Sequence, residues 1–252
     1  MFQNNPFSLT EKTILVTGAS SGIGQAVAIE CSKAGARVVI TGRNRERLTQ
    51  TLGQLSGSGH RMIIADLSNY ENIVSLVDQC PVLDGLSNNA GIAKGLLIRS
   101  MSREYLDAIM NTNAYGPILL TQLLFKKKKL ADKASVVFTS SLSGVFVVSE
   151  GEAAYAASKG AISGFAKGAA LEFSKKGIRV NCVNPCIIVT DLFKRDGIFV
   201  NQEQIDEAAK NFPLKRLGNP IDVALAHVYL LSEAASWITG INLPIDGGFT
   251  IR

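Results

Sequence analysis

The sequence predicts an α/β fold: a doubly wound parallel sheet of about seven strands with helices on both faces, forming a three-layer sandwich. Short apolar runs alternate with helical patterns along all 252 residues, which is typical of parallel strands joined by helical crossovers. A glycine-rich segment joins the first strand to the first helix, and polar motifs follow several later strands. Because no linker or repeat divides the chain, we expect one domain over residues 1–252.

In the first half of the chain, each expected strand is a short apolar run and each expected helix has apolar residues at helical spacing. Gly35 is expected to end the first helix, and Asn44 to cap the second. The strand around Leu86 has a weak pattern and is placed by its context. The expected strands are 13–17, 37–41, 62–65 and the segment around 86, and the expected helices are 22–34, 44–55 and 68–79.

The second half begins with a long helical pattern that contains Gly116 and Pro117, where we expect a kink or a break. Pro220 suits the first turn of the last helix. The remaining strands are expected at 134–138, 179–183 and 241–245, and the remaining helices at 102–129, 149–174, 203–210 and 220–232.

The glycine-rich segment, Gly18-x3-Gly22-x-Gly24, lies where the first strand turns into the first helix. Glycine accepts unusual backbone angles and lets a ligand approach the main chain. A helix N-terminus offers N–H groups and a partial positive charge, which suit a phosphate. The spacing is related to the dinucleotide-binding fingerprint without matching it. A tight turn without a ligand is the alternative, but the flanking strand and helix favour nucleotide binding.

Tyr155 and Lys159 are four residues apart on an expected helix and therefore share one face. A lysine ammonium nearby is expected to lower the pKa of the tyrosine, so that it exchanges protons with an alcohol or a carbonyl. Such a pair also occurs by chance. Here, however, Ser140-Ser141, Asp66 and Pro185 all follow predicted strands. The ends of parallel strands meet at one edge of a sheet, so these groups should gather there.

Composition narrows the function classes. The net charge is +5, and the one basic run, 126–129, is expected to be a solvated helix end rather than a nucleic-acid site. The four cysteines show no paired spacing and the two histidines lie far apart, so we expect no disulfide framework and no metal site. Without a signal-peptide pattern or a membrane-spanning run, we expect a cytoplasmic protein with no membrane partner.

The motifs together resemble those of the short-chain dehydrogenase/reductase family, over nearly the full length. The matching residues are 17–24, Asn88-Asn89-Ala90-Gly91, Asn113, Ser141, Tyr155-x-x-x-Lys159, Asn184-Pro185 and Asp246-Gly247-Gly248. The resemblance implies a Rossmann-type fold and an oxidoreductase that transfers a hydride between a nicotinamide cofactor and a secondary alcohol or ketone. Possible substrates are a 3-oxoacyl thioester, a polyol and a hydroxysteroid.

The resemblance also implies the roles of the site residues. Tyr155 is the general acid or base, and Lys159 holds the nicotinamide ribose. Ser141 polarises the substrate oxygen, with Ser140 and Ser143 as alternatives. Asn113, with Asn111 as the alternative, serves a proton relay. The residues expected to bind the cofactor are Gly18, Ser20, Ser21, Gly22, Ile23, Gly24, Arg43, Asp66, Leu67, Asn89, Ala90, Gly91, Tyr155, Lys159, Pro185, Ile188 and Thr190.

The end of the second strand indicates which cofactor is used. Ile40-Thr41-Gly42 lacks the acid that holds the ribose of NAD, and Arg43 follows directly. Arginine suits the additional phosphate of NADP, so we expect NADP, with NAD possible. The alternative is a solvated loop arginine. Asp66-Leu67 matches the pair that meets the adenine, although Asp66 also suits a helix cap.

The sequence departs from the family pattern at two positions. Cys186 stands where the family has glycine, and Ser87 where an apolar strand residue is usual. Cys186 keeps a second hypothesis open: a non-catalytic regulator that binds a dinucleotide.

Two further features concern the substrate and the assembly. Residues 190–218 resemble the substrate lid, in which Phe193, Phe199 and Phe212 either line a pocket opposite Val145 and Phe146 or pack the segment down. Small residues recur at Ala156, Gly160, Gly164 and Gly168 along one helix face. They suit either packing within the protein or, as the resemblance implies, a homo-oligomer, most often a tetramer, otherwise a dimer.

Overall fold

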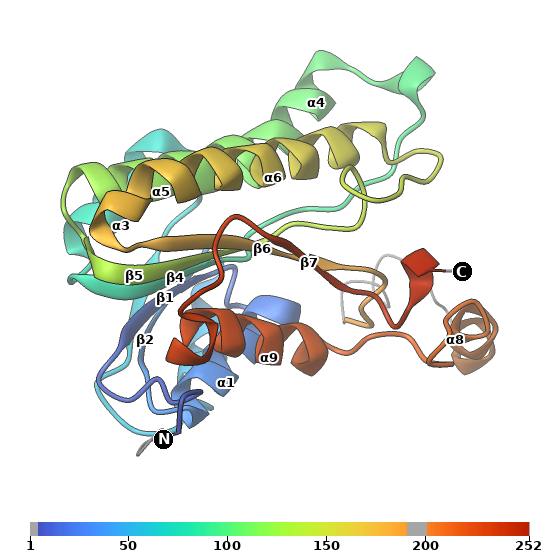
Figure 1. Ribbon diagram of the computed structural model, residues 1–252. Helices are drawn as coiled ribbons and strands as arrows, with labels where there is room; N and C mark the ends of the chain where they lie inside the picture. Colours follow the sequence, from blue (N-terminus) through green and yellow to red (C-terminus); the bar gives the residue numbers. More distant parts are fainter. Residues whose placement is uncertain (1–4, 191–200, 252) are drawn as a thin grey trace.

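The computed structural model describes residues 5–190 and 201–251. It has three layers, with a twisted sheet between two sets of helices (Figure 1). The sheet order is β3-β2-β1-β4-β5-β6-β7, and every neighbouring pair of strands is parallel. The strands are β1 (Thr13–Thr17), β2 (Arg37–Gly42), β3 (Arg61–Ile64), β4 (Leu83–Asn88), β5 (Leu130–Thr139), β6 (Arg179–Pro185) and β7 (Asn242–Ile245). The predicted doubly wound α/β sheet is confirmed.

The helices cover both faces of this sheet (Figure 1). They are α1 (Gly22–Lys33), α2 (Arg45–Leu52), α3 (Tyr70–Gln79), α4 (Arg103–Met110), α5 (Gly116–Lys126), α6 (Ala153–Phe173), α8 (Gln202–Ala209) and α9 (Pro220–Leu231). Helices α3, α5 and α6 bury apolar side chains against one face, and α1, α2 and α9 against the other. Each face thus has its own hydrophobic core, which fixes the sheet as a rigid platform.

The register of the sheet aligns the ends of its central strands. Val16 of β1 lies beside Ser87 of β4, Ser87 lies beside Val137 of β5, and Val137 lies beside Asn181 of β6. Since all these strands run in one direction, the segments that leave their carboxyl ends start at the same edge. The polar motifs that were predicted to follow strands therefore share one edge of the molecule.

The long helix predicted over 102–129 is in fact three pieces. A π-helical turn, Asn111–Tyr115, separates α4 from α5, directly before Gly116 and Pro117. The expected break is thus confirmed, although it begins before the Gly-Pro pair. The predicted end at 129 is wrong. The helix stops at Lys126, because Lys128 adopts a positive φ of 57° that a helix cannot contain.

Strand β5 begins at Leu130, earlier than the predicted 134, because Leu130 pairs with Leu83 before an irregularity in the β4–β5 register. Helix α6 begins at Ala153 rather than 149, because Glu152 closes a turn in which its carboxylate accepts hydrogen bonds from Ser143 and Ser149. The side chain of Asn44 accepts a hydrogen bond from the Arg47 N–H, so its predicted capping role is confirmed.

Candidate active site

The glycine turn after β1 is shaped by close backbone packing. Gly18 has a positive φ of 65°, and a Cβ there would lie 2.9 Å from the backbone nitrogen of Ala90. A Cβ on Gly24 would overlap the carbonyl of Gly18. Side chains are therefore excluded at both positions, and the first turn of α1 can approach a ligand through its backbone. Ser21 is the N-cap but makes no capping hydrogen bond with its side chain.

The segment after β4 packs directly on this turn. The Thr17 hydroxyl accepts hydrogen bonds from the backbone N–H of Asn89, at 2.9 Å, and of Ala90, at 3.1 Å. A Cβ on Gly91 would lie 3.3 Å from Oδ1 of Asn113 and 3.6 Å from Nζ of Lys159. The absence of a side chain at Gly91 thus keeps space beside the predicted catalytic lysine.

Of the three serines considered, Ser141 has the position that suits a reacting group. Its side chain lies close enough to the Tyr155 phenol to act on the pKa of that phenol, and its hydroxyl accepts the Ser143 N–H at 3.1 Å. Ser140 instead donates its hydroxyl to the Lys159 carbonyl within the core, and Ser143 donates its hydroxyl to Glu152. Asn184 of β6 fixes the position of Ser141 by donating to its carbonyl at 2.7 Å.

Tyr155 and Lys159 come from adjacent turns of α6 and lie together, as their spacing predicted. Nζ of Lys159 is 5.6 Å from the centroid of the Tyr155 ring and donates to the carbonyl of Thr139 at 2.8 Å. Lys159 is 5% exposed, and burial lowers its pKa to about 8. A proton on this lysine is therefore held weakly compared with a solvated one.

The expectation that the pKa of Tyr155 is lowered is wrong for the structure as it stands. Burial raises the pKa of the phenol, the hydrogen bond with Ser141 lowers it in part, and the carboxylate of Glu152 raises it further. The physical reason is that Lys159 directs its ammonium group to the Thr139 carbonyl rather than to the phenol oxygen.

Asn113 lies in the π-helical turn and is 1% exposed. Its side chain makes both hydrogen bonds to the backbone of Ile92, accepting from the N–H at 2.8 Å and donating to the carbonyl at 2.9 Å. It also donates to Ser158 of α6 at 3.2 Å. These contacts belong to Asn113 and not to its alternative, Asn111, and they tie α4, α6 and the segment after β4 together.

At the other end of the glycine turn, Arg43 and Asp66 follow β2 and β3. Their charged groups are 3.8 Å apart and both side chains are substantially exposed, so the pair contributes little to stability. Burial alone would raise the pKa of Asp66, but hydrogen bonds from Ser68 and the charge of Arg43 outweigh it and lower the pKa. Asp66 accepts from the Ser68 N–H and hydroxyl, whereas α3 is capped by Asn69.

The segment after β6 continues the same edge. Cys186 is half buried, and its backbone N–H donates to the Ile245 carbonyl. The side chain of Ile188 is buried against Gly218, so only its backbone is available to a ligand. Thr190 lies against the glycine turn, 3.3 Å from where a Cβ of Gly22 would be.

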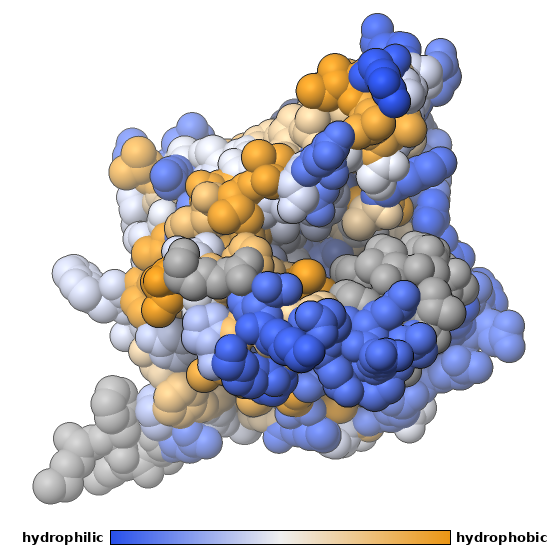
Figure 2. Space-filling view, turned by 90° about the vertical axis from the view of Figure 1, so that its right-hand side faces the viewer, coloured by the Kyte–Doolittle hydropathy of each residue, from blue (hydrophilic) through white to orange (hydrophobic). Residues whose placement is uncertain are grey.

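The predicted lid is described in part. Phe193 and Phe199 lie outside the described residues, whereas Phe212 is buried and packs against Phe249. Phe146 is exposed, as are Val148 and Ile98. Figure 2 looks onto this side of the molecule and shows hydrophilic residues gathered over α8, with hydrophobic residues above them. The opening at this edge is thus bordered by surfaces of different polarity.

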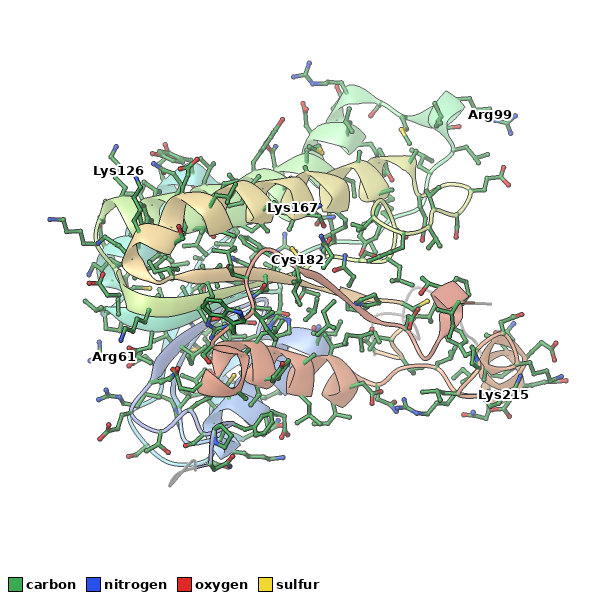
Figure 3. All side chains as sticks on the ribbon, in the orientation of Figure 1. Arg61, Arg99, Lys126, Lys167, Cys182 and Lys215 are labelled. Atoms are coloured by element: carbon green, nitrogen blue, oxygen red, sulfur yellow. The ribbon has the colours of Figure 1, made fainter. Side chains whose placement is uncertain are left out.

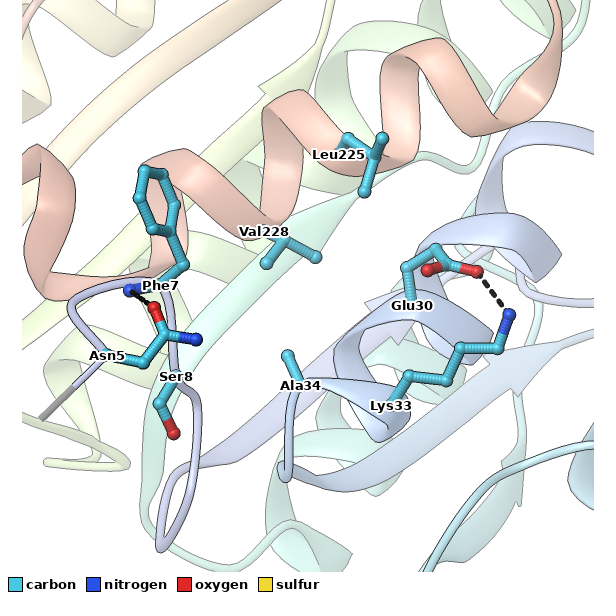
Figure 4. A pocket seen from close by; sticks show the side chains of 8 residues that line it. All are labelled: Asn5, Phe7, Ser8, Glu30, Lys33, Ala34, Leu225 and Val228. Atoms are coloured by element: carbon cyan, nitrogen blue, oxygen red, sulfur yellow. Dashed lines mark hydrogen bonds and ion pairs between the residues drawn. The ribbon is translucent and has the colours of Figure 1, made fainter.

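Two other features lie away from this edge. A hollow of about 330 Å³ is lined by the C-terminal turn of α1, the N-terminal segment and α9 (Figure 4), so it lies at the opposite edge from the glycine turn.

Lys126, the first residue of the basic run, lies at the end of α5 remote from Arg99 (Figure 3). In the part of the chain that the structure describes, no helix is long and apolar enough to span a bilayer.

Comparisons with known proteins agree with this geometry. The family model described as enoyl-(acyl carrier protein) reductase matches residues 18–250. A 3-oxoacyl-[acyl-carrier-protein] reductase from Rickettsia felis is 35% identical over 95% of this chain and 97% of its own. A solved structure described as a short chain dehydrogenase/reductase family protein is 32% identical, with a TM-score of 0.84 over 96% of this chain and 99% of that one.

The chain belongs to the short-chain dehydrogenase/reductase family. Another solved family member, described as a candidate NAD(P)-dependent gluconate 5-dehydrogenase from Beutenbergia cavernae, holds NADP at low occupancy. It is 29% identical with a TM-score of 0.88, over 98% of this chain and all of that one. The named family members are oxidoreductases, and this chain is an oxidoreductase of the same family.

The residues of this chain fit a dinucleotide cofactor. The glycine turn excludes side chains where a pyrophosphate would meet the first turn of α1, and Gly91 leaves space beside Lys159. Arg43 is exposed at the end of β2, where a ribose or its phosphate would lie.

Three residues near the site were missed or undervalued by sequence reasoning, namely His227, Thr139 and Ser87. They form hydrogen bonds with one another and with the predicted Asn89 just beneath the site. Of the three, only Ser87 carried a signal, because it is polar where an apolar strand residue is usual.

Proposed function

We propose that this chain is an NADP(H)-dependent oxidoreductase that interconverts secondary alcohols and ketones, with Tyr155 as the general acid or base. The observation that carries the proposal is the convergence of three side chains at one edge of the sheet. The Ser141 side chain lies close enough to the Tyr155 phenol to act on its pKa, and Lys159 Nζ lies 5.6 Å from the same ring. This set can bind a carbonyl oxygen and supply its proton.

When bound, the cofactor supplies or accepts the hydride. In the direction of reduction, Ser141 donates a hydrogen bond to the carbonyl oxygen and Tyr155 transfers the proton that converts the oxygen into a hydroxyl. Lys159 holds the ribose, with its ammonium group anchored on the Thr139 carbonyl. Asn113 fixes the segment after β4 beside Lys159, and in this proposal supports the relay that returns the proton.

Arg43 supports NADP over NAD. Its side chain follows β2 and is exposed, and among the residues that the structure describes its acidic partner is Asp66 at 3.8 Å. A planar guanidinium suits the additional phosphate of NADP. Arg43→Ala should raise the KM for NADPH about tenfold or more and leave the KM for NADH nearly unchanged. Arg45→Ala, two residues further along, is the matched control. Equal effects on both cofactors would argue against this role.

The substrate class is a secondary alcohol or its ketone, with 3-oxoacyl thioesters, polyols and hydroxysteroids as the first compounds to test. The relatives described above are named for an acyl thioester and for gluconate, so the family identity leaves the choice open. The test is an absorbance assay of NADPH and NADH against carbonyl compounds, and of both oxidised cofactors against alcohols. Cofactor binding without turnover across the panel would favour a non-catalytic dinucleotide-binding regulator.

The assembly is proposed to be a homo-oligomer, a tetramer or a dimer, formed through the outer faces of α5 and α6. Among the described residues, no atom lies within 4 Å of a Cβ added at Gly164 or Gly168 of α6, and Leu171 of the same helix is exposed. Gly160, by contrast, packs on Gly144 of its own chain. We also propose one domain over residues 1–252, a substrate lid at about 190–218, and a cytoplasmic location.

A further inference from the structure

Beneath the candidate site, four side chains form a closed ring of hydrogen bonds. Nδ2 of Asn89 donates to the Ser87 hydroxyl at 2.7 Å, and Ser87 lies 2.9 Å from Nδ1 of His227. Nε2 of His227 lies 2.9 Å from the Thr139 hydroxyl, which donates to Oδ1 of Asn89. The ring joins the ends of β4 and β5 to α9, which covers the face of the sheet opposite α6 (Figure 1).

The direction of each bond in the ring follows from its chemistry. Because Thr139 donates to Asn89, its oxygen must accept from His227, which places the histidine hydrogen on Nε2. Nδ1 is then an acceptor, so Ser87 donates to it and accepts from Asn89 in turn. The ring is complete only when His227 is neutral. Burial favours this form, since it lowers the pKa of His227 to about 3.

Packing alone does not account for the ring. Ser87 and His227 have no exposed surface and lie next to the apolar core between the sheet and α9. Buried polar side chains are costly unless they are hydrogen-bonded, and apolar side chains would fill the same space without that cost. The ring instead fixes the orientation of its side chains, because a closed set of hydrogen bonds allows only one arrangement of its members.

The ring is bonded to the reacting groups through Thr139 and Asn89. The backbone carbonyl of Thr139 accepts the hydrogen bond from Nζ of Lys159 at 2.8 Å. The backbone N–H of Asn89 donates to Thr17, at the start of the glycine turn. The two residues therefore carry, on their backbones, the anchors of the lysine and of the cofactor turn.

We infer that His227 is a positioning residue of the active site, which acts through the ring to fix the Thr139 carbonyl and hence the ammonium group of Lys159. The inference rests on the proposed function for its catalytic consequence. His227 touches neither substrate nor cofactor. It supports the site from the opposite face of the sheet, through its hydrogen bonds to Ser87 and Thr139.

The first test needs no turnover. Nitrogen NMR of labelled histidine should show His227 as a single neutral tautomer, with hydrogen on Nε2, across neutral pH. Thr139→Val keeps the shape and the backbone carbonyl but removes the hydroxyl, and should shift this signal. A hydrogen on Nδ1, or a histidine that titrates near its ordinary pKa, would overturn the ring.

The second test measures kcat, KM and NADPH affinity in His227→Val, Thr139→Val and the double variant. Each single variant should lower kcat about tenfold, shift the pH profile of kcat/KM, and weaken NADPH binding at least about threefold. The double variant should be little worse than either single one, since both open the same ring. Fully additive effects, or an unchanged kcat, would contradict the inference.

Val223→Ala is the matched control, because it removes a buried apolar group from the same helix without touching the ring. It should destabilise the protein and leave kcat and the pH profile unchanged. An equal loss of kcat in this control would show that His227 has only a structural role, and would overturn the inference. If the wild-type chain turns over no compound, the proposed function fails, and NADPH affinity alone then decides the inference: unchanged affinity in the ring variants would overturn it.

Discussion

At the scale of single residues, the groups that we propose to react differ from the groups that hold them in place. The Tyr155 phenol and the Ser141 hydroxyl lie next to each other at the edge of the sheet. Lys159 is anchored on Thr139, and Asn113 on Ile92. In the proposed mechanism Tyr155 supplies the proton, while the surrounding hydrogen bonds fix the positions of the side chains at the site.

Tyr155→Phe removes the proton donor and leaves the ring in place. We expect kcat to fall about 10³-fold, within the range of general acid–base catalysis, with NADPH affinity nearly unchanged. Steady-state kinetics and fluorescence titration with NADPH measure the two quantities. Tyr70→Phe is the control, because Tyr70 is exposed at the start of α3. Retained activity in Tyr155→Phe would remove this residue from its role.

His227 also predicts a dependence of stability on pH. Its folded pKa of about 3 lies below its ordinary value, so on acidification the unfolded chain takes up the proton first. The contribution of neutral His227 to the free energy of unfolding is therefore complete above pH ~6.5. It is lost as the pH falls towards 3, by about 1.4 kcal/mol per pH unit. Urea unfolding at neutral and mildly acidic pH should show a steeper loss in the wild type than in His227→Val. Equal losses of stability in the wild type and in His227→Val would contradict the lowered pKa of His227.

At the scale of elements, the loops and turns at the strand ends carry the site. The glycine turn and the segment after β4 approach each other closely at Gly18 and Ala90. The side chains of Thr17 and Asn113 hydrogen-bond the backbone of that segment, and Asn113 thereby joins the π-helical turn to it. Side chains at these contacts are small or absent because the approach is so close. A substitution in one of these segments should therefore displace the others.

Gly18→Ala tests this dependence. The residue has a positive φ and its Cβ would lie 2.9 Å from the Ala90 backbone, so we expect a loss of about 2 kcal/mol or more in the free energy of unfolding. NADPH affinity should fall as well. The control is Gly53→Ala, because Gly53 has a φ of −68° and its nearest neighbours are 3.7 Å away. Equal thermal stabilities of Gly18→Ala and Gly53→Ala would contradict the expected strain at Gly18.

How far the sequence predicts these elements depends on the kind of signal. The glycine turn, the strand ends and the Tyr155–Lys159 spacing are local patterns, and the structure brings them together as expected. The break at 111–115 and the end of α5 depend on backbone geometry that Gly116 and Lys128 only suggest. The ring is formed by residues up to 140 positions apart, and nothing in the sequence links His227 and Thr139 to Ser87 and Asn89. Such partners become visible only in three dimensions.

At the scale of the whole molecule, the open outer face of α6 is the main unexplained surface. Gly168 has no neighbouring atom within 4 Å of an added Cβ, and Leu171, one turn further on, is 77% exposed. A stripe of small residues beside an exposed leucine suits close approach of another helix. This arrangement agrees with the proposed homo-oligomer.

Gly168→Arg should disrupt that assembly. An arginine at the contact would hold two helices apart and bury its charge, so the mass measured by light scattering should fall to that of a smaller species. Gly53→Arg, on the other face of the sheet, should leave the mass unchanged. A wild-type chain that is already monomeric at working concentration would refute the assembly itself.

The all-parallel sheet also has a consequence for how this chain reaches its native state. No two neighbouring strands can form a hairpin, and the central pairing brings Ile14 of β1 beside Gly85 of β4. Long segments must be synthesised before the middle of the sheet can close, which makes folding slow and leaves strand edges exposed to other chains. Recovery after dilution from denaturant should therefore be best at low protein concentration.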